Sequence, residues 1–197
     1  LASAWAYIGL AVMVEIVAEI SGNHGGNLNK ACHLIDEAAA CGCDYVKFQY
    51  YRPEDMPDRN QGDNEEMYRK LMVHDDWLPQ MFSNAHACGV GLFASVFSVR
   101  AVRELLKYDV PFIKIASPDS TGLDYKVVRS ITSEVPDDVQ VIWSSRTQLH
   151  GKILYCPLGH PPTITYRDFK IFREGNFYGF SDHTSGIRTP LAFIRAG

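Results

Sequence analysis

The sequence predicts an α/β protein built as a shortened (β/α)8 barrel of the TIM type. Seven short runs rich in β-branched and aromatic residues recur along the 197 residues, and amphipathic stretches of helical length lie between most of them. This alternation is typical of parallel strands joined by crossover helices. A hydrophobic content of 46% is enough for one sizeable core.

The expected strands are these apolar runs, at residues 14–20, 45–50, 91–97, 112–116, 140–143, 152–156 and 177–180. An eighth run is not visible, although a complete barrel requires one. The connection at residues 147–151 is also shorter than the dozen or so residues that a parallel crossover needs. We therefore expect an incomplete barrel with about seven strands.

The expected helices lie between these runs. Residues 28–40 place Leu28, Cys32, Ile35 and Ala39 on one stripe, and residues 98–108 begin with Ser98 as an N-cap. Residues 64–88 are predicted to be helical in two parts. Because no repeat, low-complexity segment or Gly/Ser linker interrupts the pattern, residues 13–197 are expected to form a single domain.

The first twelve residues do not fit the pattern. LASAWAYIGLAVM is apolar, but it is too short to span a bilayer and has no basic region before it. We interpret residues 1–12 as a non-native or disordered extension, with a signal peptide as the alternative.

Charge and cysteine content limit the class of protein. The formal net charge is −4 and no Lys/Arg block occurs, so a nucleic-acid or anionic-membrane surface is not expected. Five cysteines, an odd number, lie within or beside apolar segments, which indicates reduced thiols in the cytoplasm. Cys41 and Cys43 have no second cysteine pair to complete a zinc site, and we interpret them as helix-end packing.

Polar side chains stand at the end of nearly every expected strand. They are Glu19 with the loop Ser21–Gly26, Lys47 and Gln49, Ser95, Lys114 and Ser117, Ser144 to Arg146, His160, and Ser181 to Thr184. In a parallel barrel these ends meet at one rim, where active sites lie. Lysines together with serine hydroxyls suit a substrate that carries phosphate and carboxylate.

Taken alone, a strand lysine is more often a residue that extends to water, and a histidine is more often structural. The structural interpretation is the one that we give to His33, His74, His86 and His150.

Four linked motifs resemble the sialic acid synthase (N-acetylneuraminate synthase) family. They are VAEISGNHGGNLNKACHLIDEAAACGCDYVKFQYY, FASVF, FIKIAS and FYGFSDHTSGI, which follow the family's order and spacing over residues 14–190. The resemblance implies a (β/α)8 barrel that condenses phosphoenolpyruvate with an N-acyl hexosamine aldehyde, such as N-acetylmannosamine, to give a nonulosonic acid and phosphate. It also implies a divalent metal, Mn²⁺ or Mg²⁺, and a homodimer.

The resemblance assigns roles by motif. It implies catalytic roles for Glu19, Lys47, Lys114 and Asp182, substrate binding by Asn23, Gln49, Ser95, Ser117, Ser144 and Ser181, and metal binding by His183. The family's second metal histidine lies in an eighth-strand motif that we do not find, and His160, where members carry tyrosine, is the candidate to replace it. The family's fifth-strand STG is Ser144-Ser145-Arg146 here. The last strand and the C-terminal antifreeze-like domain are expected to be absent.

Two other interpretations stay open. The chain can be a catalytically weak barrel or fragment that only binds a phosphorylated metabolite or associates with another chain through an open strand edge. It can also be a Schiff-base aldolase that uses Lys47 or Lys114, which requires one lysine to be desolvated in an apolar pocket. The synthase and the metabolite-binding interpretations both require Lys47 and Lys114 to face one mouth.

Overall fold

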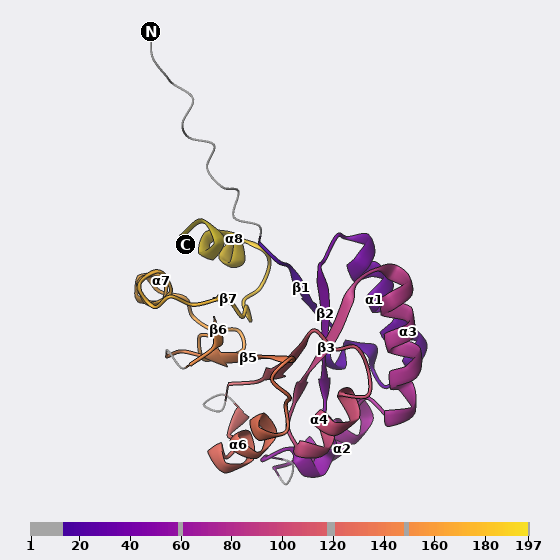
Figure 1. Ribbon diagram of the computed structural model, residues 1–197. Helices are drawn as coiled ribbons and strands as arrows, with labels where there is room; N and C mark the ends of the chain where they lie inside the picture. Colours follow the sequence, from indigo (N-terminus) through magenta and orange to yellow (C-terminus); the bar gives the residue numbers. More distant parts are fainter. Residues whose placement is uncertain (1–13, 59–60, 118–120, 148–149, 197) are drawn as a thin grey trace.

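The computed structural model describes residues 14–58, 61–117, 121–147 and 150–196, and the extension predicted at residues 1–12 lies outside them. All seven predicted strands are confirmed, in one parallel sheet of order β1-β2-β3-β4-β5-β6-β7. They are β1 (Val17–Glu19), β2 (Tyr45–Tyr50), β3 (Gly91–Val96), β4 (Phe112–Ile115), β5 (Gln140–Ser145), β6 (Lys152–Tyr155) and β7 (Gly179–Phe180). The sheet curls, so that β5 and β6 run across the direction of β1 to β3 (Figure 1). The shortened barrel-type fold predicted from the sequence is therefore confirmed.

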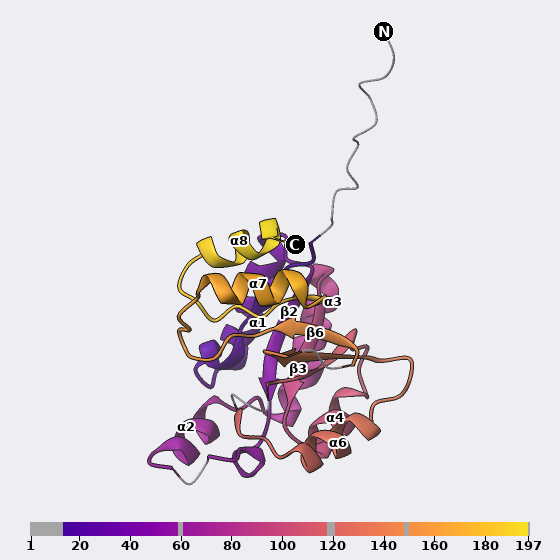
Figure 2. The same cartoon turned by 90° about the vertical axis from the view of Figure 1, so that its left-hand side faces the viewer.

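The helices cover the outer face of the curled sheet (Figures 1 and 2). They are α1 (Leu28–Ala40), α2 (Asn64–Leu71), α3 (Leu78–Cys88), α4 (Val99–Leu105), α6 (Tyr125–Ser133), α7 (Tyr166–Glu174) and α8 (Arg188–Ala196), with short 3-10 turns η1 (Ser21–His24), η2 (Pro53–Asp55) and η3 (Asp75–Trp77). Ser98 caps α4 as predicted, since its hydroxyl accepts a hydrogen bond from the Ala101 amide. Across the described ranges, none of these helices combines the length and the apolar character needed to cross a bilayer.

Strand alternation separates two apolar layers. Successive side chains of a strand point to opposite faces. On β2, Val46, Phe48 and Tyr50 are fully buried against the helices in the main core. Tyr45, of the opposite parity on the same strand, points inward, where a second, smaller apolar layer forms the floor of the barrel. That floor consists of Tyr45, Phe93, Phe112, Ile142 and Leu154, with the rings of Tyr45 and Phe112 edge to face at 5.1 Å.

The two edge strands approach each other at the N-terminal end of the barrel. β1 and β7 are not paired with each other within the described sheet. Instead, Glu15 accepts hydrogen bonds from the Tyr45 and Tyr178 hydroxyls, both at 3.0 Å, and so links the chain before β1 to the chain before β7. Lys152 donates to the Tyr178 hydroxyl at 3.1 Å. These polar contacts join the two sides of the barrel beneath its apolar floor.

The short connection between β5 and β6 is compatible with parallel pairing. We expected residues 147–151 to be too short for this, yet Ser144 pairs with Leu154 and Ser145 with Tyr155 in a parallel register. The expectation was wrong because it assumed a crossover helix. Residues 150–151 and 146–147, the described parts of this connection, are not helical.

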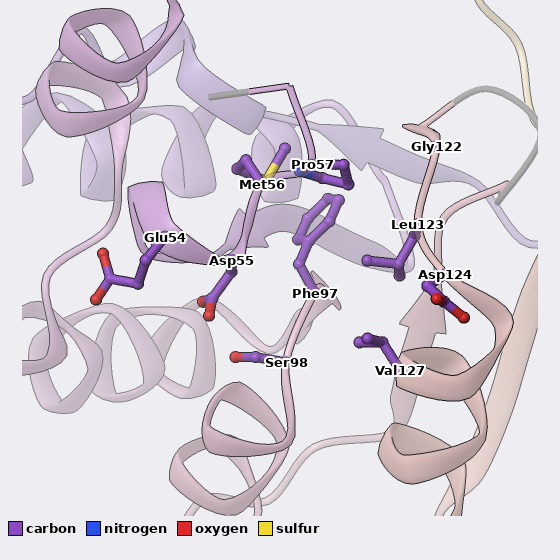
Figure 3. A pocket seen from close by; sticks show the side chains of 10 residues that line it. All are labelled: Glu54, Asp55, Met56, Pro57, Phe97, Ser98, Gly122, Leu123, Asp124 and Val127. Atoms are coloured by element: carbon purple, nitrogen blue, oxygen red, sulfur yellow. The ribbon is translucent and has the colours of Figure 1, made fainter. Parts of the chain in front are cut away.

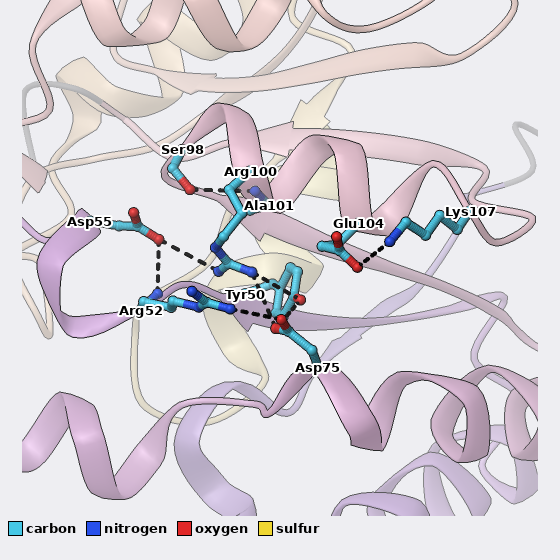
Figure 4. Close-up of polar contacts among 9 residues, drawn as sticks. All are labelled: Tyr50, Arg52, Asp55, Asp75, Ser98, Arg100, Ala101, Glu104 and Lys107. Atoms are coloured by element: carbon cyan, nitrogen blue, oxygen red, sulfur yellow. Dashed lines mark hydrogen bonds and ion pairs between the residues drawn. The ribbon is translucent and has the colours of Figure 1, made fainter.

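A charged network fixes the loop after β2 to the helices (Figure 4). The Asp75 carboxylate accepts hydrogen bonds from the Tyr50 hydroxyl at 2.5 Å, from Arg52 at 2.8 Å and from Arg100 at 3.1 Å. Desolvation opposes ionisation of Asp75, but the Tyr50 and Arg52 hydrogen bonds and the charges of Arg100 and Arg52 outweigh it and lower its pKa. Because Tyr50 is fully buried, its hydroxyl depends on this carboxylate.

We predict that Asp75→Asn lowers the free energy of unfolding by about 1 kcal/mol at neutral pH, because the Tyr50 and arginine donors lose a charged acceptor. The folded pKa of Asp75 is depressed, so its contribution is complete above the unfolded pKa and is lost as pH falls through the folded pKa. Urea unfolding at several pH values measures this difference. Asp76→Asn, at an exposed neighbouring position, is the matched control. An equal loss in both variants would contradict the network's role.

Candidate functional site

A polar layer lies directly above the apolar floor. Because inward positions recur every second residue, each floor residue is followed two positions later by a polar inward residue at the strand's C-terminal end. Along β2 to β6 these are Lys47, Ser95, Lys114, Ser144 and, just past the end of β6, Cys156. Glu19 ends β1 and Ser181 follows β7. The curl of the sheet brings this layer into one mouth.

The two lysines face this same mouth. Lys47 Nζ donates to Ser95 Oγ at 3.0 Å and forms an ion pair with Glu19, its register partner on β1. Lys114 Nζ donates to Ser144 Oγ at 2.5 Å and to the Ile115 carbonyl at 3.3 Å. Ser95 and Lys114 are register partners on β3 and β4, which places the two lysine contacts side by side. The geometry that the sequence interpretation required is therefore present.

Lys114 is a buried cation without an ion-pair partner in the described structure. It is only 3% exposed, so it does not extend to water as an edge lysine would. Burial is the main cause that lowers its pKa to about 7, and the charge of Lys47 lowers it further, against smaller opposing effects of Cys156 and Glu19. Its partners are a hydroxyl and a carbonyl, which are neutral. An anion entering the mouth would supply the missing charge.

Ser117 adds an unsatisfied hydroxyl near the end of β4. It is 3% exposed, and its Oγ is buried with no hydrogen-bond partner among the described residues. Its carbonyl accepts hydrogen bonds from the Thr121 amide and hydroxyl, both at 3.0 Å. A buried hydroxyl without a partner can bind a ligand oxygen.

Two histidines from different loops meet at the mouth. His160 follows β6 and His183 follows β7, and their rings are 4.3 Å apart between centroids and nearly perpendicular. Partial desolvation lowers the pKa of His183, and the charges of His160, Lys47 and Lys114 lower it further, which shows that the ring is close to the lysines. Within the described residues, no group of three His, Cys, Asp or Glu side chains could together hold a metal. The structure therefore brings His160 and His183, the two metal ligands predicted from the sequence, next to each other without a third such side chain among the described residues.

The remaining predicted residues differ in how they are placed. Gln49 is half-buried on the inner face of β2 as the register partner of Ser95, whereas Asn23 is exposed on η1. The Asp182 carboxylate accepts hydrogen bonds from the Thr184 amide at 2.9 Å and from the Thr184 hydroxyl at 2.8 Å. Its contacts therefore stabilise the turn after β7. Arg146, expected at the rim, instead acts electrostatically on Tyr155 and Asp168.

Sequence reasoning missed Cys156. It is 4% exposed, and its amide donates to the Ser145 carbonyl at 3.0 Å, which holds it at the inner end of β6. The signal was present in the sequence, because Cys156 stands two residues after the inward-facing Leu154. We had interpreted it only as one of several reduced thiols.

Two surface hollows lie outside this mouth. One, of about 380 Å³, is lined by Met56, Phe97 and Leu123 with the carboxylates of Glu54, Asp55 and Asp124 around them (Figure 3). The other, of similar volume, is lined by Arg52 and residues 72–76. The first is apolar and acidic, so it would repel a phosphorylated ligand. The polar layer of the mouth remains the best candidate site.

Comparisons with known proteins agree with the fold described above. Residues 34–144, more than half of the chain, match the model of the NeuB family. An uncharacterised protein of Methanocaldococcus jannaschii is 28% identical over 97% of this chain and 61% of its own length. The pseudaminic acid synthase of Helicobacter pylori is 29% identical over 93% of this chain and 63% of its own length. The chain thus spans less than two thirds of these relatives. The N-acetylneuraminic acid (sialic acid) synthetase of Leptospira borgpetersenii has the same fold, with a TM-score of 0.75 at 24% identity over 93% of this chain and 70% of that one.

We predict that Lys114→Met stabilises the ligand-free protein. The folded pKa of Lys114 is about 7, below its ordinary 10.5, so the unfolded chain binds more protons between these values and stability rises with pH across that window. The variant should exceed the wild type by a few kcal/mol in free energy of unfolding at and below about pH 7, and the gap should shrink toward about pH 10.5. Denaturant unfolding measures it. A variant less stable than the wild type at pH 6 would contradict this account.

Proposed function

This chain belongs to the NeuB family, and from that premise we propose that it condenses phosphoenolpyruvate with the open-chain aldehyde of an N-acyl amino sugar. The product would be a nonulosonic acid, with phosphate released. The single observation that carries the proposal is Lys114, which is buried beside Lys47 and has no ion-pair partner among the described residues. Two of the proteins named above are a pseudaminic acid synthase and an N-acetylneuraminic acid synthetase, whose products differ, so the acceptor is proposed only as a class.

The mouth has the charge and donors that phosphoenolpyruvate needs. Its phosphate and carboxylate are separated by only a few bonds, so one molecule can contact Lys47 and Lys114 together. The hydroxyls of Ser95 and Ser144 bond to these lysines, and that of Ser117 is buried without a partner in the described part of the chain. Ligand oxygens would replace Ser144 as the partner of Lys114 with a charged acceptor, which is a stronger one.

The reaction follows from holding this ester in place. The C3 carbon of phosphoenolpyruvate forms a bond to the aldehyde carbon, whose oxygen takes up a proton. Water then adds at C2, and phosphate leaves as the bond between C2 and the bridging oxygen breaks. Lys47 and Lys114 stay fixed around the phosphate and carboxylate and stabilise charge as it develops. We propose that Glu19, 41% exposed beside Lys47, accepts a proton from that water or a hydrogen bond from the sugar.

We propose that His160 and His183 hold the divalent metal. Two imidazole nitrogens suit a first-row transition ion such as Mn²⁺ better than Mg²⁺, which prefers oxygen ligands, and water and substrate would complete the coordination. When bound, the metal would supply Lewis-acid polarisation of the aldehyde oxygen. The residues therefore fit the ion that the sequence resemblance implies, with His160 in the place of an eighth-strand histidine.

The proposal includes the setting in which the enzyme works. Small molecules are its partners, and association as a homodimer stays a prediction. All five cysteines are free thiols. This supports the cytoplasmic location that we propose, because thiols stay reduced there.

A Schiff-base aldolase is the second candidate, and one observation favours it. Lys114 is a desolvated lysine with a pKa of about 7, which makes its amine nucleophilic at neutral pH. Borohydride reduction in the presence of pyruvate would trap a covalent adduct on Lys114 if it forms an imine. The synthase proposal predicts that no adduct forms, because phosphoenolpyruvate reacts through C3 and carries no ketone.

We predict that Lys114→Met weakens phosphoenolpyruvate binding by more than about thirtyfold, because the substrate loses a buried cation. Lys152→Met is the matched control, since this lysine belongs to the same sheet but contacts Tyr178 beneath the floor; its binding should stay within about twofold of the wild type. Calorimetric titration measures both. Retained affinity in Lys114→Met would overturn the proposal.

Turnover gives a separate readout of the metal. We predict phosphate release from phosphoenolpyruvate only when Mn²⁺ and an N-acyl amino sugar such as N-acetylmannosamine are both present. His183→Ala and His160→Ala should each weaken Mn²⁺ binding at least about tenfold, measured by paramagnetic resonance of free Mn²⁺, whereas exposed His33→Ala should not. Unchanged Mn²⁺ affinity in both site variants would contradict the assignment. Phosphoenolpyruvate binding without release would favour a protein that only binds it.

A further inference from the structure

The Cys156 thiol occupies a position that the proposed reaction does not use. The Cys156 amide donates to the Ser145 carbonyl at 3.0 Å, and the Ser181 amide donates to the Tyr155 carbonyl at 2.8 Å. These two backbone hydrogen bonds place Cys156 between the end of β5 and the start of the loop after β7. Its neighbours on the inner face are therefore Ser144 on one side and Ser181 on the other.

The sulfur is enclosed at that position. Cys156 is 4% exposed, and its Sγ is 3.8 Å from the Pro157 carbonyl. Burial raises the pKa of the thiol, while the charge of Lys114 and the nearby hydroxyls of Ser181 and Ser144 partly oppose that rise. The thiol hydrogen is donated to the Pro157 carbonyl, so toward the two serines the sulfur can act only as an acceptor. The thiol is thus neutral and unreactive rather than a nucleophile. What it offers its neighbours is a weak hydrogen-bonding group.

A weak partner has a physical advantage between two ligand-binding hydroxyls. Ser144 also accepts the hydrogen bond from Lys114, so its own hydroxyl hydrogen must point elsewhere. Sulfur is a poor acceptor, so it orients a hydroxyl without holding it strongly. A phosphate or carboxylate oxygen is a much better acceptor and can take over the hydroxyl when it arrives.

We infer that Cys156 is a positioning residue of the anion pocket, which orients the hydroxyls of Ser144 and Ser181 toward phosphoenolpyruvate. This inference rests on the proposed function and adds a residue to it. The thiol need not touch the ligand, because it acts through the two serines. Its effect should therefore fall on substrate binding rather than on the chemical step.

The test compares three variants of the full chain. Cys156→Ala should raise the KM for phosphoenolpyruvate about five- to tenfold with kcat within about twofold, because the serine hydroxyls lose their orienting partner. Cys156→Ser keeps a hydrogen-bonding group, but one that holds the two serine hydroxyls more strongly than sulfur does, so it should recover only part of the loss, with KM about two- to fourfold above the wild type. Cys32→Ala removes another buried thiol, on α1 and away from the mouth, so it should change thermal stability without changing KM.

Direct binding of phosphoenolpyruvate by calorimetry separates the two levels of the argument. If the wild type binds and Cys156→Ala binds equally tightly, the role of Cys156 is wrong and the proposed function stands. The same conclusion follows if Cys156→Ser is as weak as Cys156→Ala, because shape alone would then explain the loss. If the wild type does not bind phosphoenolpyruvate, the proposed function fails and this inference fails with it.

Discussion

The site depends on one unbalanced interaction, the burial of the Lys114 ammonium against neutral partners. A hydroxyl and a carbonyl satisfy its hydrogen bonds, but neither neutralises its charge. The second lysine does not relieve this, because Lys47 already pairs with Glu19 and adds positive potential. A folded protein retains such a group at a cost in stability, and the cost is offset when an anion binds. Affinity for a small anion and reduced stability without it are therefore two consequences of the same arrangement.

The barrel creates this arrangement through the two-residue period of its strands. One set of inward positions forms an apolar floor, and the next set forms the polar mouth, so the same strands that exclude water below present cations above. Tyr45 and Lys47 show the change within one strand. The polar link among Glu15, Tyr45 and Tyr178 supports the floor from the other side and ties the two sheet edges together. Lys47, Lys114 and their serine partners are thereby held on strands, whereas His160 and His183 lie on the loops after β6 and β7.

Local sequence patterns predicted the strands and helices well, because each has its own hydrophobic period. α1 agrees with its expected bounds, and the two-part helix at residues 64–88 is present as α2 and α3. The β5–β6 connection was misjudged because a rule about helical crossovers does not cover a connection whose described residues are not helical. Lys47, Lys114, Ser95 and Ser144 were found from strand ends alone. Cys156 and the true surroundings of Arg146 were not found, since both depend on which way a side chain turns after its strand ends.

The central claim is that one small anion provides the negative partner for the Lys114 ammonium, which has no ion-pair partner among the described residues. Calorimetric titration of phosphoenolpyruvate at pH 8, in buffers of different ionisation enthalpy, measures how many protons the complex takes up. Phosphoenolpyruvate is fully ionised at this pH, so any uptake belongs to the protein. Because the pKa of Lys114 is about 7 in the free protein, binding should take up most of one proton, and Lys114→Met should lose that uptake. Binding without proton uptake in the wild type would contradict the claim.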